Sequence, residues 1–205
     1  MLSIIIATVA LLVSIFTLWI NNFRRGRLKL TQPVLFSFLY ELPSGEPKVF
    51  LRASLYTTGK RGHVIEGMYI KLKRQDASQI FDFWMYGETK NLMIGSGLRV
   101  GEDGVSYNHH FVPPKESVFD FEPGEYTIEV YARVVNHRSP ILLSTVKLQV
   151  TPELAIALRN RDNGVIFTRL GEAAGYRAHI SHPPAEVPTS FLDAPDQTLL
   201  PSRSR

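Results

Sequence analysis

Cysteine is absent from the 205 residues, which excludes disulfide bonds, thiol catalysis and cysteine-ligated zinc. The absence does not identify a compartment, because proteins on either side of a bacterial membrane can lack cysteine. A chain of this length accommodates one ordinary domain with additional segments, and such a domain buries enough core to be stable without cross-links. The sequence therefore predicts one globular domain held together by its hydrophobic core.

Most of the chain has no net charge. The formal net charge is +4, but Arg24, Arg25, Arg27 and Lys29 lie within six residues, and the remainder holds 19 basic and 19 acidic residues. A neutral remainder without a basic, aromatic-interleaved face is not typical of a DNA- or RNA-binding protein, so no nucleic-acid partner is expected. The four cations lie where charge orients a membrane helix and contacts anionic headgroups, and we predict those two roles for them.

Charged side chains are also absent from Met1 to Asn22. Leu2–Ile20 contains nineteen residues, of which twelve are Leu, Ile, Val or Phe. As a helix it spans about 28 Å against a hydrocarbon core of about 30 Å, and its apolar side chains supply roughly −4 to −7 kcal/mol of insertion free energy. Residues 1–22 are therefore predicted to be a transmembrane signal anchor that contacts the lipid bilayer through Leu2, Ile6, Leu11, Ile15, Trp19 and Ile20.

A cleaved signal peptide is the alternative for this segment. Such a peptide has a basic start, a shorter apolar stretch and small residues before the cut. Here Met-Leu-Ser precedes the apolar run and Trp19-Ile20-Asn21-Asn22 ends it, so the sequence favours an uncleaved anchor. Because cations flank only its C-terminal side, the positive-inside rule predicts a single-pass protein of the cell (inner) membrane, with its N-terminus outside and its domain in the cytoplasm.

Helical periodicity is absent between Leu28 and Val150, where apolar and polar residues alternate with a period of two. That period is typical of half-buried strands, and Gly- and Pro-containing turns separate the runs. About seven to nine short strands predict an antiparallel, immunoglobulin-like β-sandwich and disfavour parallel α/β folds. The alternating runs are 34–39, 49–56, 68–73, 81–86, 126–133 and 145–150, with weaker segments at 97–100 and 107–112.

The C-terminal part of the chain has a different pattern. Thr151-Pro152-Glu153 is typical of a helix start and predicts a short helix through Asn160. Segments 165–170 and 176–180 predict a closing hairpin, and the Pro-, Ser- and Thr-rich residues that follow predict a disordered tail. The predicted organisation is an anchor (1–22), a basic linker (23–33), a β-sandwich domain with the helix and hairpin (34–180) and a tail (181–205).

Two resemblances concern the architecture. Glu122–Ala132 resembles the Gly-x-Tyr strand of immunoglobulin-like sandwiches, in which the tyrosine, here Tyr126, bonds back to the preceding loop. The second resemblance rests on five segments: Phe23–Lys29, Thr31–Pro33, Pro47–Leu51, Asn108–Phe111 and Gly124–Ala132. Through them the chain, from Phe23 to about Ile180, resembles a group of bacterial proteins with a short N-terminal anchor and no assigned activity. That resemblance implies a signal anchor followed by an immunoglobulin-like β-sandwich, and no particular chemistry.

Motifs that indicate catalysis are scarce, and no catalytic residue or cofactor is predicted. His109 and His110 are weak metal candidates, because neighbours in a strand point to opposite faces and one ion would need further ligands, such as His63 or His137. Gly95–Gly101 is rich in glycine, but its spacing matches neither a dinucleotide fingerprint nor a P-loop, and no predicted helix follows it. We therefore interpret it as an inter-strand loop.

Trp84 and Tyr86 belong to a run that is apolar on both sides. Such a run forms either a strand buried on both faces or an exposed aromatic surface for a protein partner. The sequence as a whole predicts a non-enzymatic, membrane-tethered module that binds a protein at the cytoplasmic membrane face, with Trp84 and Tyr86 as a possible partner surface. Two alternatives stay open: a small-ligand or metal-binding enzyme that uses the His109/His110 region, and a periplasmic, envelope-associated binding domain.

Overall fold

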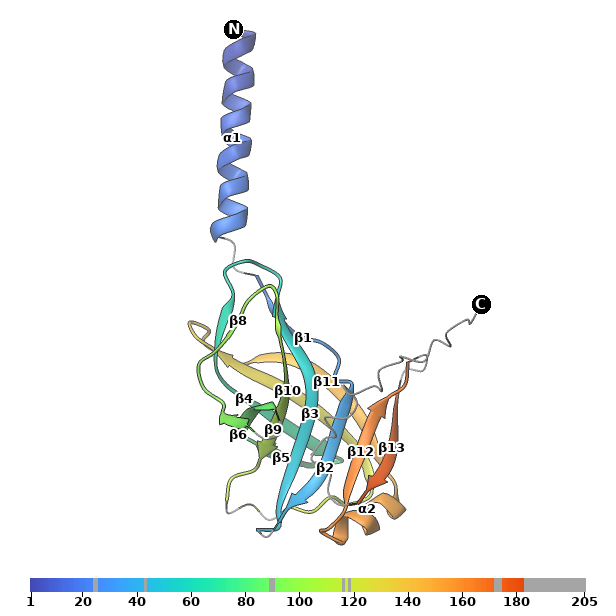
Figure 1. Cartoon of the computed structure of the whole chain (residues 1–205). Helices are drawn as coiled ribbons and strands as arrows, with labels where there is room; N and C mark the ends of the chain where they lie inside the picture. The colour runs from blue at the N-terminus through green and yellow to red at the C-terminus, as the bar shows by residue number, and fades with distance from the viewer. Residues whose placement is uncertain are drawn as a thin grey trace, which may run out of the picture.

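An N-terminal helix stands apart from a β-rich domain in the computed structural model, which describes residues 1–23, 26–42, 44–88, 91–115, 117, 119–171 and 175–182 (Figure 1). The helix α1 spans Leu2–Phe23. Its window Leu2–Trp19 is long and apolar enough to cross a membrane, and none of it is buried against the domain. Thr8, Ser14 and Thr17 donate their hydroxyls to carbonyls four residues earlier at 2.7–2.9 Å, which satisfies these polar groups within the helix.

The domain consists of two antiparallel sheets. The larger has eight strands in the order β13-β12-β2-β3-β9-β6-β7, with β1 also paired to β3. The smaller has five strands in the order β11-β10-β4-β5, with β8 also paired to β4. The larger sheet comprises β1 (Leu28–Leu30), β2 (Leu35–Glu41), β3 (Glu46–Thr57), β6 (Phe83–Glu88), β7 (Asn91–Ile94), β9 (Val105–Val112), β12 (Gly164–Arg169) and β13 (Tyr176–Ser181); the smaller comprises β4 (His63–Arg74), β5 (Ala77–Phe81), β8 (Leu98–Val100), β10 (Gly124–Val134) and β11 (Ile141–Val150).

Alternation along each strand places one apolar face of each sheet against the other. In β10, Ile128, Val130 and Ala132 are fully buried and the residues between them are not. The centre of the core is aromatic: Phe38 stacks on Phe121 at 4.7 Å between ring centroids and meets Tyr126 and Phe167 edge-on. The predicted mainly β, two-sheet architecture is therefore confirmed, as are the weaker strands β8 and β9. The predicted number of seven to nine strands is too low, because the described residues form thirteen, several of them only three to five residues long.

The C-terminal prediction also agrees with the structure. Helix α2 (Pro152–Arg159) begins after Thr151, whose side chain accepts a hydrogen bond from the amide of Leu154. The hairpin of β12 and β13 then adds to the edge of the larger sheet at β2. The predicted disordered tail lies, from Pro183 onward, outside the described residues.

The predicted run 81–86 is not one strand. It divides at Asp82, where β5 of the smaller sheet ends and β6 of the larger sheet begins. The alternation changes phase there, so that Phe81 and Trp84 are buried while Phe83 is exposed. The alternation of apolar and polar residues cannot reveal such a crossing. It indicates which residues of a strand share a face, but not which sheet the strand joins or which of its faces points to the core.

Tyr126 makes the loop contact predicted from its sequence. Its hydroxyl donates to the carbonyl of Glu122 at 2.8 Å, just before β10. Tyr126→Phe should therefore lower the free energy of unfolding of the full-length protein in detergent by about 1–2 kcal/mol, because a partly buried carbonyl loses its partner. Denaturant unfolding measures this, and Tyr131→Phe is the matched control, since that hydroxyl lies on the face of β10 away from the core, where it bonds to the Glu129 carboxylate. Equal losses for the two variants would contradict a structural role for the Tyr126 contact.

Candidate functional site

His109 points into the core between the sheets. It is fully buried, and its Nδ1 accepts a hydrogen bond from Trp84 Nε1 at 3.2 Å. Burial lowers the pKa of His109 to about 4, and the Ala53 backbone offsets part of this effect. Its Nε2 has no hydrogen-bond partner of good geometry. The ring is therefore a neutral core residue that orients Trp84.

His110 points to the opposite face of the same strand, as expected for a neighbour. It packs edge-on against Phe50, with ring centroids 4.7 Å apart. Burial lowers its pKa to about 3, and the nearby charge of Lys48 adds to the shift. Asn108 lies on this same face and accepts a hydrogen bond from Arg52 at 3.4 Å. The predicted divergence of the two histidines is confirmed.

Because of this divergence, the two rings do not face a common site. Among the described residues, no group of three or more His, Asp or Glu side chains is arranged to hold a metal ion. His63 and His137, the additional ligands considered from the sequence, lie beside each other at 5.9 Å between ring centroids but belong to a different part of the domain. In the part of the chain that the structure describes, the His109/His110 region therefore contains no set of ligands of this kind.

The glycine-rich segment Gly95–Gly101 is built into the sheets. Leu98–Val100 forms β8 at the edge of β4, and the Gly95 amide donates to the Trp84 carbonyl at 2.8 Å. A Cβ on Gly95 would lie 2.0 Å from the indole ring of Trp84, so only glycine permits this approach. The segment therefore packs against Trp84 as an inter-strand connection.

Trp84 and Tyr86 do not form an exposed surface. Trp84 is 3 % exposed and Tyr86 is 7 % exposed, and their rings stack on each other at 4.9 Å. The partner-surface prediction for these two residues is wrong, because the crossing at Asp82 turns both of them inward. The other interpretation, a buried strand, is the one that the structure shows.

Exposed apolar side chains gather instead at the neighbouring edge of the larger sheet. Phe83 of β6 is 47 % exposed, and Met93 and Ile94 of β7 are 53 % and 71 % exposed. Among the described strands, β7 pairs with β6 only, so its other side presents free backbone groups. Sequence reasoning missed this edge, although the short apolar run Leu92-Met93-Ile94 beside a glycine-rich segment was a signal for it.

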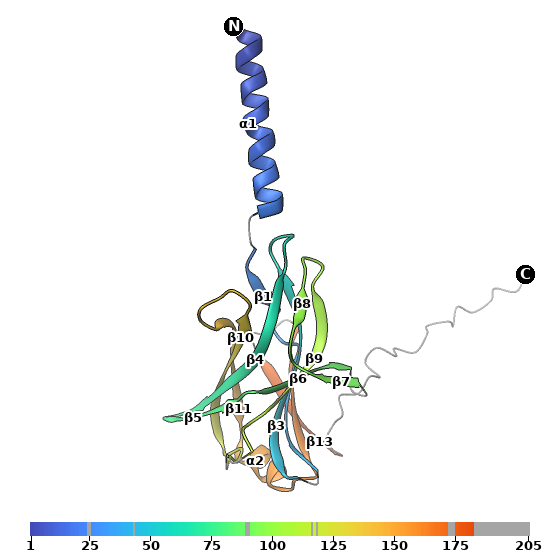
Figure 2. The ribbon, with the colours of Figure 1, turned by 90° about the vertical axis from the view of Figure 1, so that its left-hand side faces the viewer.

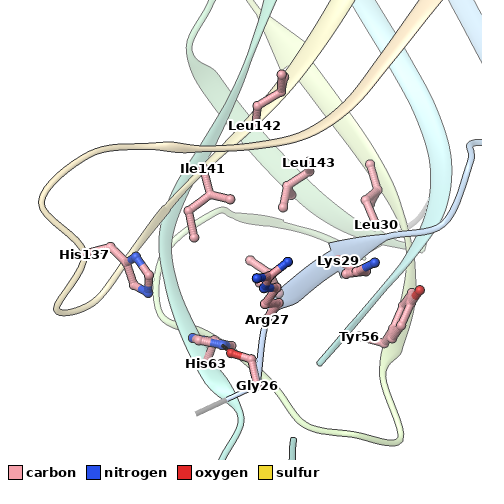
Figure 3. A pocket seen from close by; sticks show the side chains of 11 residues that line it. Gly26, Arg27, Lys29, Leu30, Tyr56, His63, His137, Ile141, Leu142 and Leu143 are labelled. Carbon is pink, nitrogen blue, oxygen red and sulfur yellow. Dashed lines mark hydrogen bonds between the residues drawn. The ribbon is translucent and has the colours of Figure 1, made fainter. Parts of the chain in front are cut away.

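A second feature is a cleft at the end of the domain that faces α1. It has a volume of about 620 Å³ and lies where β1 runs beside β11 (Figure 3). Ile141 and Leu143 point from β11 toward Arg27, and in this view His63 lies below Arg27 and His137 lies to its left (Figure 3). No acidic residue is present among the lining residues, which are Gly26, Arg27, Leu28, Lys29, Leu30, Tyr56, His63, His137 and Ile141–Leu143.

Backbone contacts hold the wall of this cleft in place. The Arg27 amide donates to Thr58 Oγ1 at 2.8 Å, and the Thr58 amide donates to the Arg27 carbonyl at 3.1 Å. His63 Nε2 lies 2.8 Å from the Gly26 carbonyl and must be the donor, because a carbonyl only accepts. The segment that carries Arg27 is therefore attached to the loop between β3 and β4.

The predicted headgroup residues divide into two pairs. Arg27 and Lys29 both line the cleft, are exposed and form no ion pair with any residue that the structure describes. Arg24 and Arg25 lie outside the described residues, as does the side chain of Ile20. The predicted anchor residues Leu2, Ile6, Leu11, Ile15 and Trp19 are all more than half exposed. The contributions of His63, His137 and β11 to the cleft carry no sequence signal, since these segments lie far apart in the chain.

Comparisons of this chain with models of protein families, with curated proteins and with solved structures find no match.

Proposed function

We propose that this chain is a single-pass, membrane-anchored, non-enzymatic binding module that presents an immunoglobulin-like domain to a protein partner at the cytoplasmic face of the cell membrane. The observation that carries the proposal is the complete exposure of the apolar helix α1. In water an uncovered apolar surface of this size is unfavourable, and a bilayer removes that cost. Tethering also raises the effective concentration of a weak binder, which makes a small interface sufficient.

The strand order supports the immunoglobulin-like part of the proposal. Taken in chain order as A to G, the strands β2-β3-β9-β6 follow the A-B-E-D order of one sheet, and β4-β10-β11 follow the C-F-G order of the other. The bond from Tyr126 to the Glu122 carbonyl, at the start of the strand in position F, has the geometry of the tyrosine corner. The resemblance to anchored bacterial proteins belongs to the same proposal, and β1, β5, β7, β8 and the β12–β13 hairpin are additions to this framework.

The edge strand β7 is the surface that we propose for the protein partner. An extended segment of another protein can add to it as a further strand, with main-chain hydrogen bonds supplying affinity. The exposed side chains of Phe83, Met93 and Ile94 would then become buried on the two faces of the extended sheet.

Site-specific photocrosslinking in intact membranes tests this surface. A crosslinker at Met93 or Ile94 should capture a defined protein, and one at Arg133, which is exposed on the central strand β10, should not. Capture of a second copy of this chain would show that the partner at this edge is another copy of the same protein. Equal labelling from Met93 and Arg133 would contradict the proposed edge.

A further inference from the structure

We propose that the cleft between β1 and β11 binds the phosphate-containing headgroup of an anionic phospholipid. The proposal rests on the membrane anchor inferred above, because the lipid must reach the domain. Gly26, at the rim of the cleft, follows the last residue of α1, Phe23, by three residues. Three residues extend at most about 11 Å, and the headgroup region is about 6 Å thick on each side of the hydrocarbon core. The cleft is therefore held close to the headgroups whatever the tilt of the helix.

The lining of the cleft has a cationic part and an apolar part, which match the anionic headgroup and the apolar chains of a phospholipid. Arg27 and Lys29 supply cationic donors, and a guanidinium can hold two phosphate oxygens at once. Leu30, Ile141 and Leu143 form an apolar wall suited to the glycerol and the first methylenes of an acyl chain. The two parts adjoin each other, because Arg27 lies beneath Ile141 and Leu143 (Figure 3).

The cations are held in position by the fold. Gly26 approaches the β3–β4 loop so closely that a Cβ would lie 2.2 Å from the Gly59 amide nitrogen. His63 donates to the Gly26 carbonyl, and Thr58 bonds both backbone groups of Arg27. His63 and Thr58 are therefore positioning residues, whereas Arg27, Lys29 and the exposed His137 are the side chains placed to contact a phosphate.

The surrounding charge also favours an anion. We define the helix-facing end as residues 26–29 with the loops 58–62, 101–104 and 135–140. The first two loops lie next to the end of α1 (Figure 2), and the third contributes His137 to the lining of the cleft. It contains five of the 23 basic residues (Arg27, Lys29, Lys60, Arg61 and Arg138) and two of the 19 acidic ones (Glu102 and Asp103), which leaves 18 basic and 17 acidic residues elsewhere. The positive excess of the protein is therefore concentrated around the cleft.

Native mass spectrometry of the full-length protein in neutral detergent micelles tests the proposal. Doping the micelles with phosphatidylglycerol should give protein that retains this lipid, with phosphatidylcholine retained at least about tenfold less. Arg27→Gln/Lys29→Gln should lose this preference by at least about tenfold, although Arg24 and Arg25 remain. Arg169→Gln/Arg177→Gln, which removes two exposed charges from β12 and β13, should retain it. Unfolding temperatures of both variants should stay near that of the unaltered protein.

Three outcomes would overturn the proposal. Equal retention of the two lipids would show no headgroup selection, and an equal loss in the Arg169/Arg177 variant would indicate diffuse charge rather than a cleft. Inorganic phosphate that displaces the lipid at millimolar concentration, and stabilises the protein equally, would assign the site to a soluble phosphate compound. Because the micelle assay does not require α1 to span a bilayer, it separates failure of the cleft from failure of the anchor.

Discussion

Replacing Leu11 and Leu12 with arginine should release the protein from membranes. Both residues lie at the centre of α1 and are exposed. Each arginine costs about 2.5–3.5 kcal/mol at the centre of a bilayer and also removes the gain from a leucine, so the pair offsets an insertion free energy of roughly −4 to −7 kcal/mol. Fractionation after alkaline extraction should find the unaltered chain in the membrane pellet and the variant in the supernatant.

Leu11→Val/Leu12→Val is the matched control, because it keeps the segment apolar and should stay in the pellet. Unaltered protein in the soluble fraction without detergent would contradict the anchor, and so would a mature N-terminus after Asn22. In spheroplasts, protease applied from outside should leave the β domain intact. Digestion of the domain by this external protease would contradict the cytoplasmic location and support the periplasmic alternative.

Acid should destabilise the β domain before its carboxylates titrate. The folded-state pKa values of His109 and His110, about 4 and about 3, lie below the ordinary pKa of 6.5 for an unburied ring. Between these values the unfolded chain binds protons that the folded chain excludes, so the free energy of unfolding falls as pH decreases from 6.5 toward 4. The expected loss from neutral pH to pH 5 is about 2 kcal/mol for each ring.

Denaturant unfolding of the full-length protein between pH 5 and pH 8 measures this loss. His110→Gln should remove about half of the dependence on pH in this range, because glutamine does not titrate. His109→Gln should remove a similar part while also lowering stability at neutral pH, since Trp84 Nε1 loses the acceptor that it bonds at 3.2 Å. An unchanged pH dependence in the double variant would show that the two rings are not the groups responsible.

Much of the architecture follows from local sequence. The period of two locates the strands, Thr151-Pro152 marks the start of α2, and the tyrosine of the Gly-x-Tyr segment makes its contact with Glu122. These features depend on interactions within a few residues or on which faces of a strand are apolar. The separation of His109 and His110 follows for the same reason, because strand geometry alone sends neighbours to opposite faces.

The sequence by itself determined an apolar, uncharged N-terminal segment, a mainly β domain and a cationic junction between them. Only the tertiary structure decided that Trp84 and Tyr86 face inward, that β7 forms an apolar edge, and that Arg27 and Lys29 line a cleft with His137 and β11. The physical reason is that alternation identifies two faces of a strand but not the sheet it joins. Which face becomes covered, and which distant segments meet, depends on the chain crossing between sheets at Asp82 and on β1 lying beside β11.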